Sequence, residues 1–173
     1  MPDLVASVSS ILATSAARWT ALARIDPEIL ARRPSPGEWS AIQCLQHVVD
    51  TELVVFRARV LAILEGRDFE GFDPETQGHV DAVGRQPAGL AAEFERARAD
   101  SLATLAGLTA ADLSRTARHA DLGLVTLEQL LSEYAAHDTM HLVQAERALM
   151  QAFIPGSGPW RGSFSDHDVD AEG

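Results

Sequence analysis

Residues 126–149, TLEQLLSEYAAHDTMHLVQAERAL, decide which fold the sequence predicts. Side chains that are mostly apolar or aromatic recur there in steps of three and four, so they share one face of an α-helix. This inward stripe comprises Leu127, Leu131, Tyr134, Asp138, His141, Ala145 and Leu149. Thr126 and Gln129 have the spacing of a capping box, and Pro155 favours an end near Phe153. We therefore expect an amphipathic helix from Thr126 to about Phe153.

Three earlier segments have the same helical pattern. In the second of them, Ser40 and Gln43 repeat the capping-box spacing, and Gly66 supplies a stop. The third begins with Pro87, a residue favoured in the first turn of a helix. The four expected helices cover residues 3–24, 40–65, 87–107 and 126–153.

The second expected helix is apolar on two sides. One stripe contains Leu45, Val49, Phe56 and Ile63. The other contains His47, Thr51, Val54, Ala58 and Leu61. Little of its circumference is then left for water, which predicts a place in the middle of a helix bundle.

The connections between helices indicate the fold class. Residues 67–85 contain scattered Gly, Pro and acidic residues without a sustained period, and a long crossover of this kind suits a bundle that is not simply up and down. We find no β-hairpin signal. We therefore expect an all-α four-helix bundle over residues 1–154.

Residues 155–173 are expected to form a flexible acidic tail that is mobile or docks through Trp160.

Composition excludes several classes of function. A formal net charge of −11 disfavours nucleic-acid binding, which depends on clustered cations. Every basic residue is Arg, so Schiff-base chemistry on a lysine amine is excluded. No apolar run approaches the ~20 residues of a membrane span, and the first residues lack a secretory pattern. We expect a cytoplasmic protein without membrane or nucleic-acid partners, in which the single Cys44 forms no internal disulfide.

Three histidines form the candidate functional site. His137 and His141 lie four residues apart, which places two imidazoles on the same side of a helix, one turn apart. His47 lies in another helical, mostly apolar stretch. Burial favours neutral imidazole, which is the form that binds a divalent ion. The sequence therefore predicts a three-histidine metal site with an open coordination position.

Carboxylates near these histidines are expected to orient the rings. Asp138 lies on the inward stripe three residues before His141, and Asp50 lies three residues after His47. For Asp50, a solvated or inter-helix charge is an equally good interpretation. Glu52 should point about 140° away from His47 on a regular helix, so we do not expect it to bind the same ion.

Other potential ligands have weaker support. Cys44 precedes His47 by one helical turn and is a conceivable fourth ligand, although unpaired cysteine is more commonly core material. The remaining histidines, His79, His119 and His167, have no placed partner, so we interpret them as solvated surface residues.

Four segments resemble one known superfamily. Residues 34–64, PSPGEWSAIQCLQHVVDTELVVFRARVLAIL, are similar to the second-helix signature of the DinB-like, or YfiT-like, metal-dependent superfamily. Residues 122–149, LGLVTLEQLLSEYAAHDTMHLVQAERAL, are similar to its final-helix signature. Two shorter segments also resemble sequences of this superfamily, namely FDPE at 72–75 and the DL of AADLSRTARH at 110–119. The resemblance spans nearly all of residues 4–153.

The resemblance implies a specific architecture and chemistry. It implies an up-down-down-up bundle, often homodimeric, with zinc or nickel bound by His47, His137 and His141. Relatives in this superfamily include bacillithiol S-transferases and mycothiol-dependent maleylpyruvate isomerase. We therefore expect a metal-dependent enzyme, a transferase that uses a low-molecular-weight thiol or a hydrolase, acting on a small electrophilic molecule. The alternative is a non-catalytic binding or stress protein with a structural metal.

Overall fold

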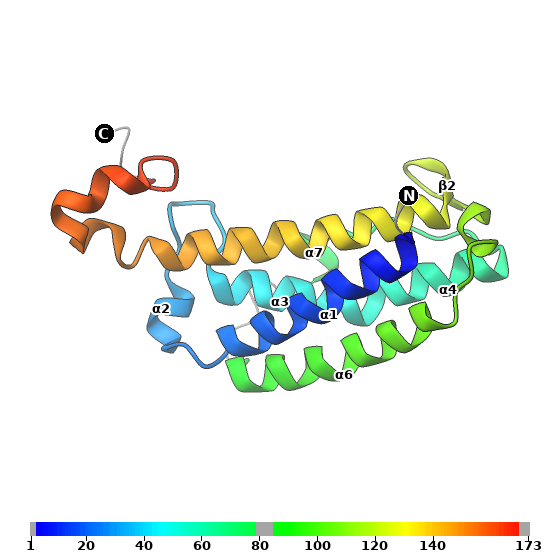
Figure 1. Ribbon diagram of the computed structural model, residues 1–173, viewed down its shortest axis with the longest axis horizontal. Helices are drawn as coiled ribbons and strands as arrows, with labels where there is room; N and C mark the ends of the chain where they lie inside the picture. The colour runs from blue at the N-terminus through cyan, green and yellow to red at the C-terminus, as the bar shows by residue number, and fades with distance from the viewer. Residues whose placement is uncertain (1–2, 79–84, 170–173) are drawn as a thin grey trace.

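The computed structural model describes residues 3–78 and 85–169, and the longest elements in them are helices (Figure 1). The long helical segments are α1 (Leu4–Leu22), α3 (Ala41–Thr51) continued by η1 (Glu52–Phe56) and α4 (Arg57–Glu65), α6 (Pro87–Ala106) and α7 (Leu127–Met150). The short elements are α2 (Pro27–Ala31), α5 (Pro74–Gln77), η2 (Asp112–Ser114), β1 (Thr116–His119), β2 (Gly123–Thr126) and η3 (Ile154–Phe164). No helix in the described part of the chain is both long enough and apolar enough to cross a lipid bilayer.

Local sequence signals set the ends of these helices. The Ser40 hydroxyl accepts the Gln43 amide hydrogen, and the Gln43 side chain accepts the Ser40 amide hydrogen, which closes the predicted capping box. Thr126 and Gln129 form the same pair at the start of α7. Gly66 ends α4 with φ 66°, a left-handed conformation that glycine adopts without strain. The four predicted helices are confirmed.

The long helices form a bundle with up-down-down-up topology (Figure 1). The helices α1 and α7 run in one direction, and the segment α3–η1–α4 and α6 run in the other. Because α4 and α6 are parallel, the chain between them must return along the length of the bundle. This confirms the predicted fold class and explains the long crossover between the second and third helices.

Buried polar side chains separate the core into two apolar clusters. One cluster includes Trp19, Leu45, Val49, Phe94 and Ala145. The other includes Leu12, Phe56, Val60, Leu105 and Leu131. On the long helices the residues between the two clusters are polar and buried, namely Ser15, His47, Asp50, Glu52, Arg98, Ser101, Asp138 and His141. The candidate site therefore lies in a polar layer across the middle of the bundle.

A β-hairpin precedes α7, so the expectation of no hairpin was wrong. The strand β1 pairs with β2 in antiparallel register, and Gly123 provides the positive φ of 77° at the turn. The crossover residue Phe69 adds to this hairpin, because its amide donates to Arg118 O and its carbonyl accepts from Ala120 N. Each strand has only four residues, which is too short for a clear alternating pattern in the sequence.

The segment η1 is a π-helical turn, and it changes which residues share a face. A π turn accommodates one extra residue, so later side chains rotate by about 100° relative to a regular helix. Val54 and Leu53 are consequently exposed, at 59% and 46% of their surface. The second helix was predicted to leave little surface to water. This prediction holds for α3, because Ala41–Thr51 is almost wholly buried, but it is wrong beyond Thr51.

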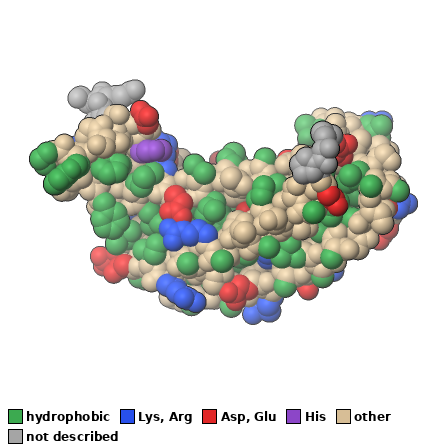
Figure 2. Space-filling view, viewed as in Figure 1, with side chains coloured by type: hydrophobic (Ala, Val, Ile, Leu, Met, Phe, Trp, Pro, Cys, Tyr) green, Lys and Arg blue, Asp and Glu red, His purple; other side chains and the backbone are tan. Residues whose placement is uncertain are grey.

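The segment after α7 projects beyond the bundle at the end opposite the hairpin (Figure 2). Gln151 holds it, because its Nε2 donates to His167 O and its Oε1 accepts from Val169 N. Arg161 and Asp168 form an ion pair within it, with 2.6 Å between Nε and Oδ2. Trp160 is 71% exposed, so the prediction of docking through this side chain was wrong.

Candidate metal centre

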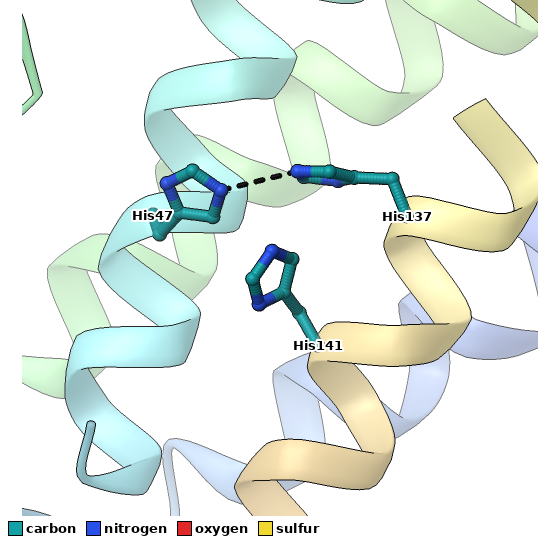
Figure 3. A group of neighbouring side chains, drawn as sticks. All are labelled: His47, His137 and His141. Carbon is teal, nitrogen blue, oxygen red and sulfur yellow. Dashed lines mark hydrogen bonds between the residues drawn. The ribbon is translucent and has the colours of Figure 1, made fainter. Parts of the chain in front are cut away.

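Three imidazoles converge between α3 and α7 (Figure 3). The nitrogens that His47, His137 and His141 offer as ligands all lie within 4.8 Å of one another. The Nε2 atoms of His47 and His137 are 3.1 Å apart. Two nitrogens bound to one tetrahedral zinc ion at the usual bond lengths would lie about 3.3 Å apart. The spacing of these nitrogens therefore fits a divalent cation with imidazole ligands.

Aromatic side chains pack around the three rings. The Trp39 ring stacks on His141, with 5.7 Å between centroids, and lies 5.0 Å from the His47 ring. The Phe56 ring meets His137 edge to face at 5.0 Å. His47 comes from the buried helix α3, and the other two histidines occupy successive turns of α7. The packed helix pair thus fixes the directions of the rings.

Hydrogen bonds select which nitrogen faces the centre. The His141 Nδ1 lies 2.9 Å from Gln144 Oε1, and an amide oxygen accepts hydrogen bonds only. Nδ1 of His141 therefore carries the hydrogen, and its Nε2 keeps a lone pair for a ligand bond. In the contact between His47 and His137 one Nε2 donates and the other accepts. A cation bound by both lone pairs would take the place of that hydrogen.

The surroundings keep all three imidazoles neutral. Burial lowers the pKa of His47 to about 4, with a smaller effect from His141 and an opposing one from Asp50. Burial also lowers the pKa of His137 to about 3, helped by the neighbouring imidazoles and by Arg59. The pKa of His141 is lowered as well, chiefly by burial, against the opposing effects of its hydrogen bond with Gln144 and of the Asp138 charge. The three side chains are thus in the form that binds a metal.

Comparisons with known proteins bear on this arrangement. The sequence profile of the DinB superfamily matches residues 12–145. The chain belongs to the DinB superfamily. Its fold is similar to that of YfiT from Bacillus subtilis, described as a probable metal-dependent hydrolase with an unusual four-helix bundle topology. The TM-score is 0.71 at 19% sequence identity, with 86% of this chain and 87% of YfiT covered. The search of curated proteins found no match.

In this DinB-superfamily protein Asp138 has a different partner from the one expected. Its Oδ1 lies 2.5 Å from Arg98 Nη2, and Arg98 also faces Glu52 Oε2 at 3.0 Å. Within the described ranges, no hydrogen bond joins Asp138 to an imidazole. Asp138 therefore acts on His141 through its charge, which raises the pKa of that imidazole.

Asp50 is buried beside the candidate centre. Its Oδ1 accepts a hydrogen bond from Gln46 Nε2 at 3.0 Å, and its charge raises the pKa of His47. The Nδ1 of His47 is buried and has no hydrogen-bond partner among residues 3–78 and 85–169. Asp50 thus contributes charge to the site, and no hydrogen bond links it to that nitrogen.

The converging group excludes the two other ligand candidates on the same helical segment. Cys44 is fully buried, and burial raises the pKa of its thiol to about 12, which keeps the thiol protonated at neutral pH. Glu52 accepts a hydrogen bond from the Tyr134 hydroxyl and pairs with Arg98. Its carboxylate faces the core network, in agreement with the prediction that Glu52 does not share an ion with His47.

The remaining histidines differ in their surroundings. His119 is only 7% exposed, so its interpretation as a surface residue was wrong. Its Nδ1 accepts the amide hydrogen of Asp121 at 3.1 Å, and the Phe69 ring packs against it edge to face. His167 is exposed, as expected. His79 lies outside the described residues.

A cavity of about 360 Å³ extends from the centre between α3, α7 and the crossover. His47 and His137 line one part of it. Its other ionisable lining residues are Arg59, His119, Asp121 and Glu133. The sequence predicted none of them as site residues, and it placed His119 at the surface. Glu133 lies four residues before His137, the same step that separates the two histidines of α7, so this local spacing was the signal that could have identified it. The histidine cluster therefore opens onto a space with acid, base and cationic side chains.

Proposed function

We propose that this protein is a metal-dependent enzyme that acts on a small electrophilic molecule with a thiol or water as the nucleophile. The observation that carries the proposal is the convergence of three neutral imidazoles, two of which line a cavity large enough for a small molecule. A divalent ion with three protein ligands lowers the pKa of a thiol or water bound at its fourth position. The description of YfiT as a probable metal-dependent hydrolase supports the hydrolase form of this proposal.

The side chains divide the remaining tasks. Gln144 holds the His141 ring with Nε2 toward the centre. Glu133 lines the cavity, and partial burial raises the pKa of its carboxylic acid against the opposing charge of Arg59. A carboxylate with a raised pKa accepts a proton more readily, so Glu133 is placed to take the proton that the nucleophile loses. Trp39 and Phe56 cover the rings and reduce the access of water to them.

Metal content and turnover test the proposal together. The protein is loaded with zinc or nickel, and bacillithiol, mycothiol, glutathione and water are compared as nucleophiles on 1-chloro-2,4-dinitrobenzene and p-nitrophenyl acetate. We expect His141→Ala to lose stoichiometric metal and turnover, and Glu133→Gln to keep the metal and lose turnover. His167→Ala removes an exposed imidazole that belongs to neither the histidine cluster nor the cavity, and it should match the wild type.

Two outcomes would reject the proposal. Full metal content in His141→Ala would show that the three histidines are not the ligands. Stoichiometric metal without turnover for any nucleophile would instead favour the alternative, in which an ion that joins α3 to α7 has a structural role.

A further inference from the structure

The π turn brings Arg59 onto the same face as His47. On a regular α-helix the step of twelve positions from His47 to Arg59 would separate the two side chains by about 120°. One extra residue accommodated in η1 reduces this separation to about 20°. The structure agrees, because His47, Thr51, Val55 and Arg59 line the same cavity. The distortion therefore gives the cavity a cationic side chain.

The contacts of Arg59 leave most of its donors available. Its Nη2 donates to the backbone oxygen of Glu70 at 3.0 Å, and its guanidinium lies over the Phe69 ring at 5.3 Å from the centroid. A guanidinium carries five N–H donors, so one backbone acceptor leaves four. In the described part of the chain, no carboxylate forms an ion pair with Arg59. Arg59 is thus held in position without a counter-ion in contact among these described residues.

Arg59 also stands where two cavities meet. The cavity beside the histidines shares Val55, Arg59, Gly71 and Phe72 with a second one of about 520 Å³ between α4 and the crossover. The second cavity is lined mainly by apolar side chains such as Val54, Leu61 and Phe69. Its other arginine, Arg67, is paired with Glu65 at 2.5 Å. A ligand that extends from the histidines into this groove must therefore pass Arg59.

We infer that Arg59 is an anchor for a carboxylate, carried either by the substrate or by the thiol that reacts with it. The reacting atom of the same molecule lies at the three-histidine cluster. This inference rests on the proposed function and adds the chemical class of its ligand. Guanidinium binds carboxylates through paired N–H donors in a fixed geometry. The apolar groove beyond Arg59 fits the hydrocarbon part of such a molecule.

The charges around the cavity favour a carboxylate over a phosphate. Glu133 and Asp121 each bring one negative charge to the cavity, against one positive charge on Arg59. A divalent ion at the histidines changes the sum from one negative to one positive charge. A carboxylate on a substrate neutralises this sum, and together with a bound thiolate it exceeds the sum by one charge. A dianionic phosphate exceeds the sum by one charge alone and by two beside a thiolate, so the carboxylate leaves less uncompensated charge in either case. Binding at Arg59 should therefore be stronger in the metal-loaded protein.

Matched thiols test the anchor. The protein is loaded with cobalt(II), whose visible spectrum reports thiolate binding, and is titrated with 3-mercaptopropionate and with its neutral analogue 3-mercaptopropan-1-ol at low salt. Mercaptoacetate and 4-mercaptobutyrate vary the span between sulfur and carboxylate. The test variant is Arg59→Gln, and the control is Arg57→Gln. Arg57 is an exposed arginine that donates to Thr104 and lines neither cavity, so its replacement removes the same charge away from the proposed anchor.

The expected result is a preference of about tenfold or more for the best mercaptocarboxylate over the neutral thiol. The preference should disappear in Arg59→Gln and persist in Arg57→Gln, with equal cobalt content in all three proteins. Metal uptake without this preference, or a preference that survives in Arg59→Gln, would overturn the anchor and leave the proposed function intact.

Absence of metal uptake would count against the proposed function instead. In that case 4-fluorobenzoate, followed by ¹⁹F NMR at high protein concentration, decides the inference separately. Line broadening in the wild type and Arg57→Gln, but not in Arg59→Gln, supports the anchor. Equal behaviour of the three proteins overturns it.

Discussion

Affinity for zinc should depend only weakly on pH between 7.5 and 5.5. Metal ions and protons compete for the same imidazole nitrogens. An imidazole with the ordinary pKa of about 6.5 is about 90% protonated at pH 5.5, so three such ligands would weaken binding about a thousandfold. Burial lowers the pKa of His47 to about 4 and that of His137 to about 3. These two side chains therefore stay neutral at pH 5.5.

His141 sets the size of the remaining effect. Its pKa is lowered from 6.5, so its protonation can weaken binding by at most about tenfold at pH 5.5. The predicted loss over two pH units is therefore about tenfold or less. Because a lowered pKa favours the neutral form, any larger loss should begin only as the pH approaches 4.

Competition with a calibrated chromophoric chelator, corrected for the chelator's own protonation, measures the zinc affinity at pH 7.5, 6.5 and 5.5. Trp39→Ala supplies a comparison, because it exposes His47 and His141 to water and should restore part of the pH dependence. A loss near a thousandfold in the wild type would refute the reasoning, since it would show that the folded protein leaves the three imidazoles at their ordinary pKa.

Three further predictions follow from the same region. Gln144→Leu removes the acceptor for His141 Nδ1 and should weaken zinc binding about 10- to 100-fold in the same competition assay, while Gln144→Glu keeps the acceptor and should bind more tightly than Gln144→Leu. Arg98→Met leaves the buried Glu52 and Asp138 carboxylates without their counter-charge, and urea unfolding should show a loss of about 3–5 kcal/mol; a loss below about 1 kcal/mol would contradict this role. The protein in free metal at about 100 times the dissociation constant should have a Tm about 5–10 °C higher than after the metal is removed with a chelator. His141→Ala should show no such difference by calorimetry.

Much of the fold and the candidate metal ligands were predictable because they depend on short-range patterns. Apolar residues at steps of three and four mark the buried face of a helix, and the stripe predicted around Tyr134 and Asp138 is buried in α7. Ser40 and Thr126 marked helix starts because a capping box involves residues only three apart. The spacing of His137 and His141 likewise placed two candidate ligands on one face before any packing was known.

The cavity and the partners of the buried charges were decided by packing between distant segments. Arg98 and Asp138 lie 40 residues apart in the chain, and their pairing requires α6 and α7 to be in place. The same holds for the addition of Phe69 to the hairpin, which buries His119.

The sequence by itself determined the four helices, their caps and the helix faces on which the three imidazoles lie, because each follows from the periodicity of a single α-helix. Only the tertiary structure decided that η1 adopts a π turn and that Arg59 consequently faces the same cavity as His47. The physical reason is that the rotation of a helix beyond such a turn is set by how its side chains pack against other helices, and no local repeat records that packing.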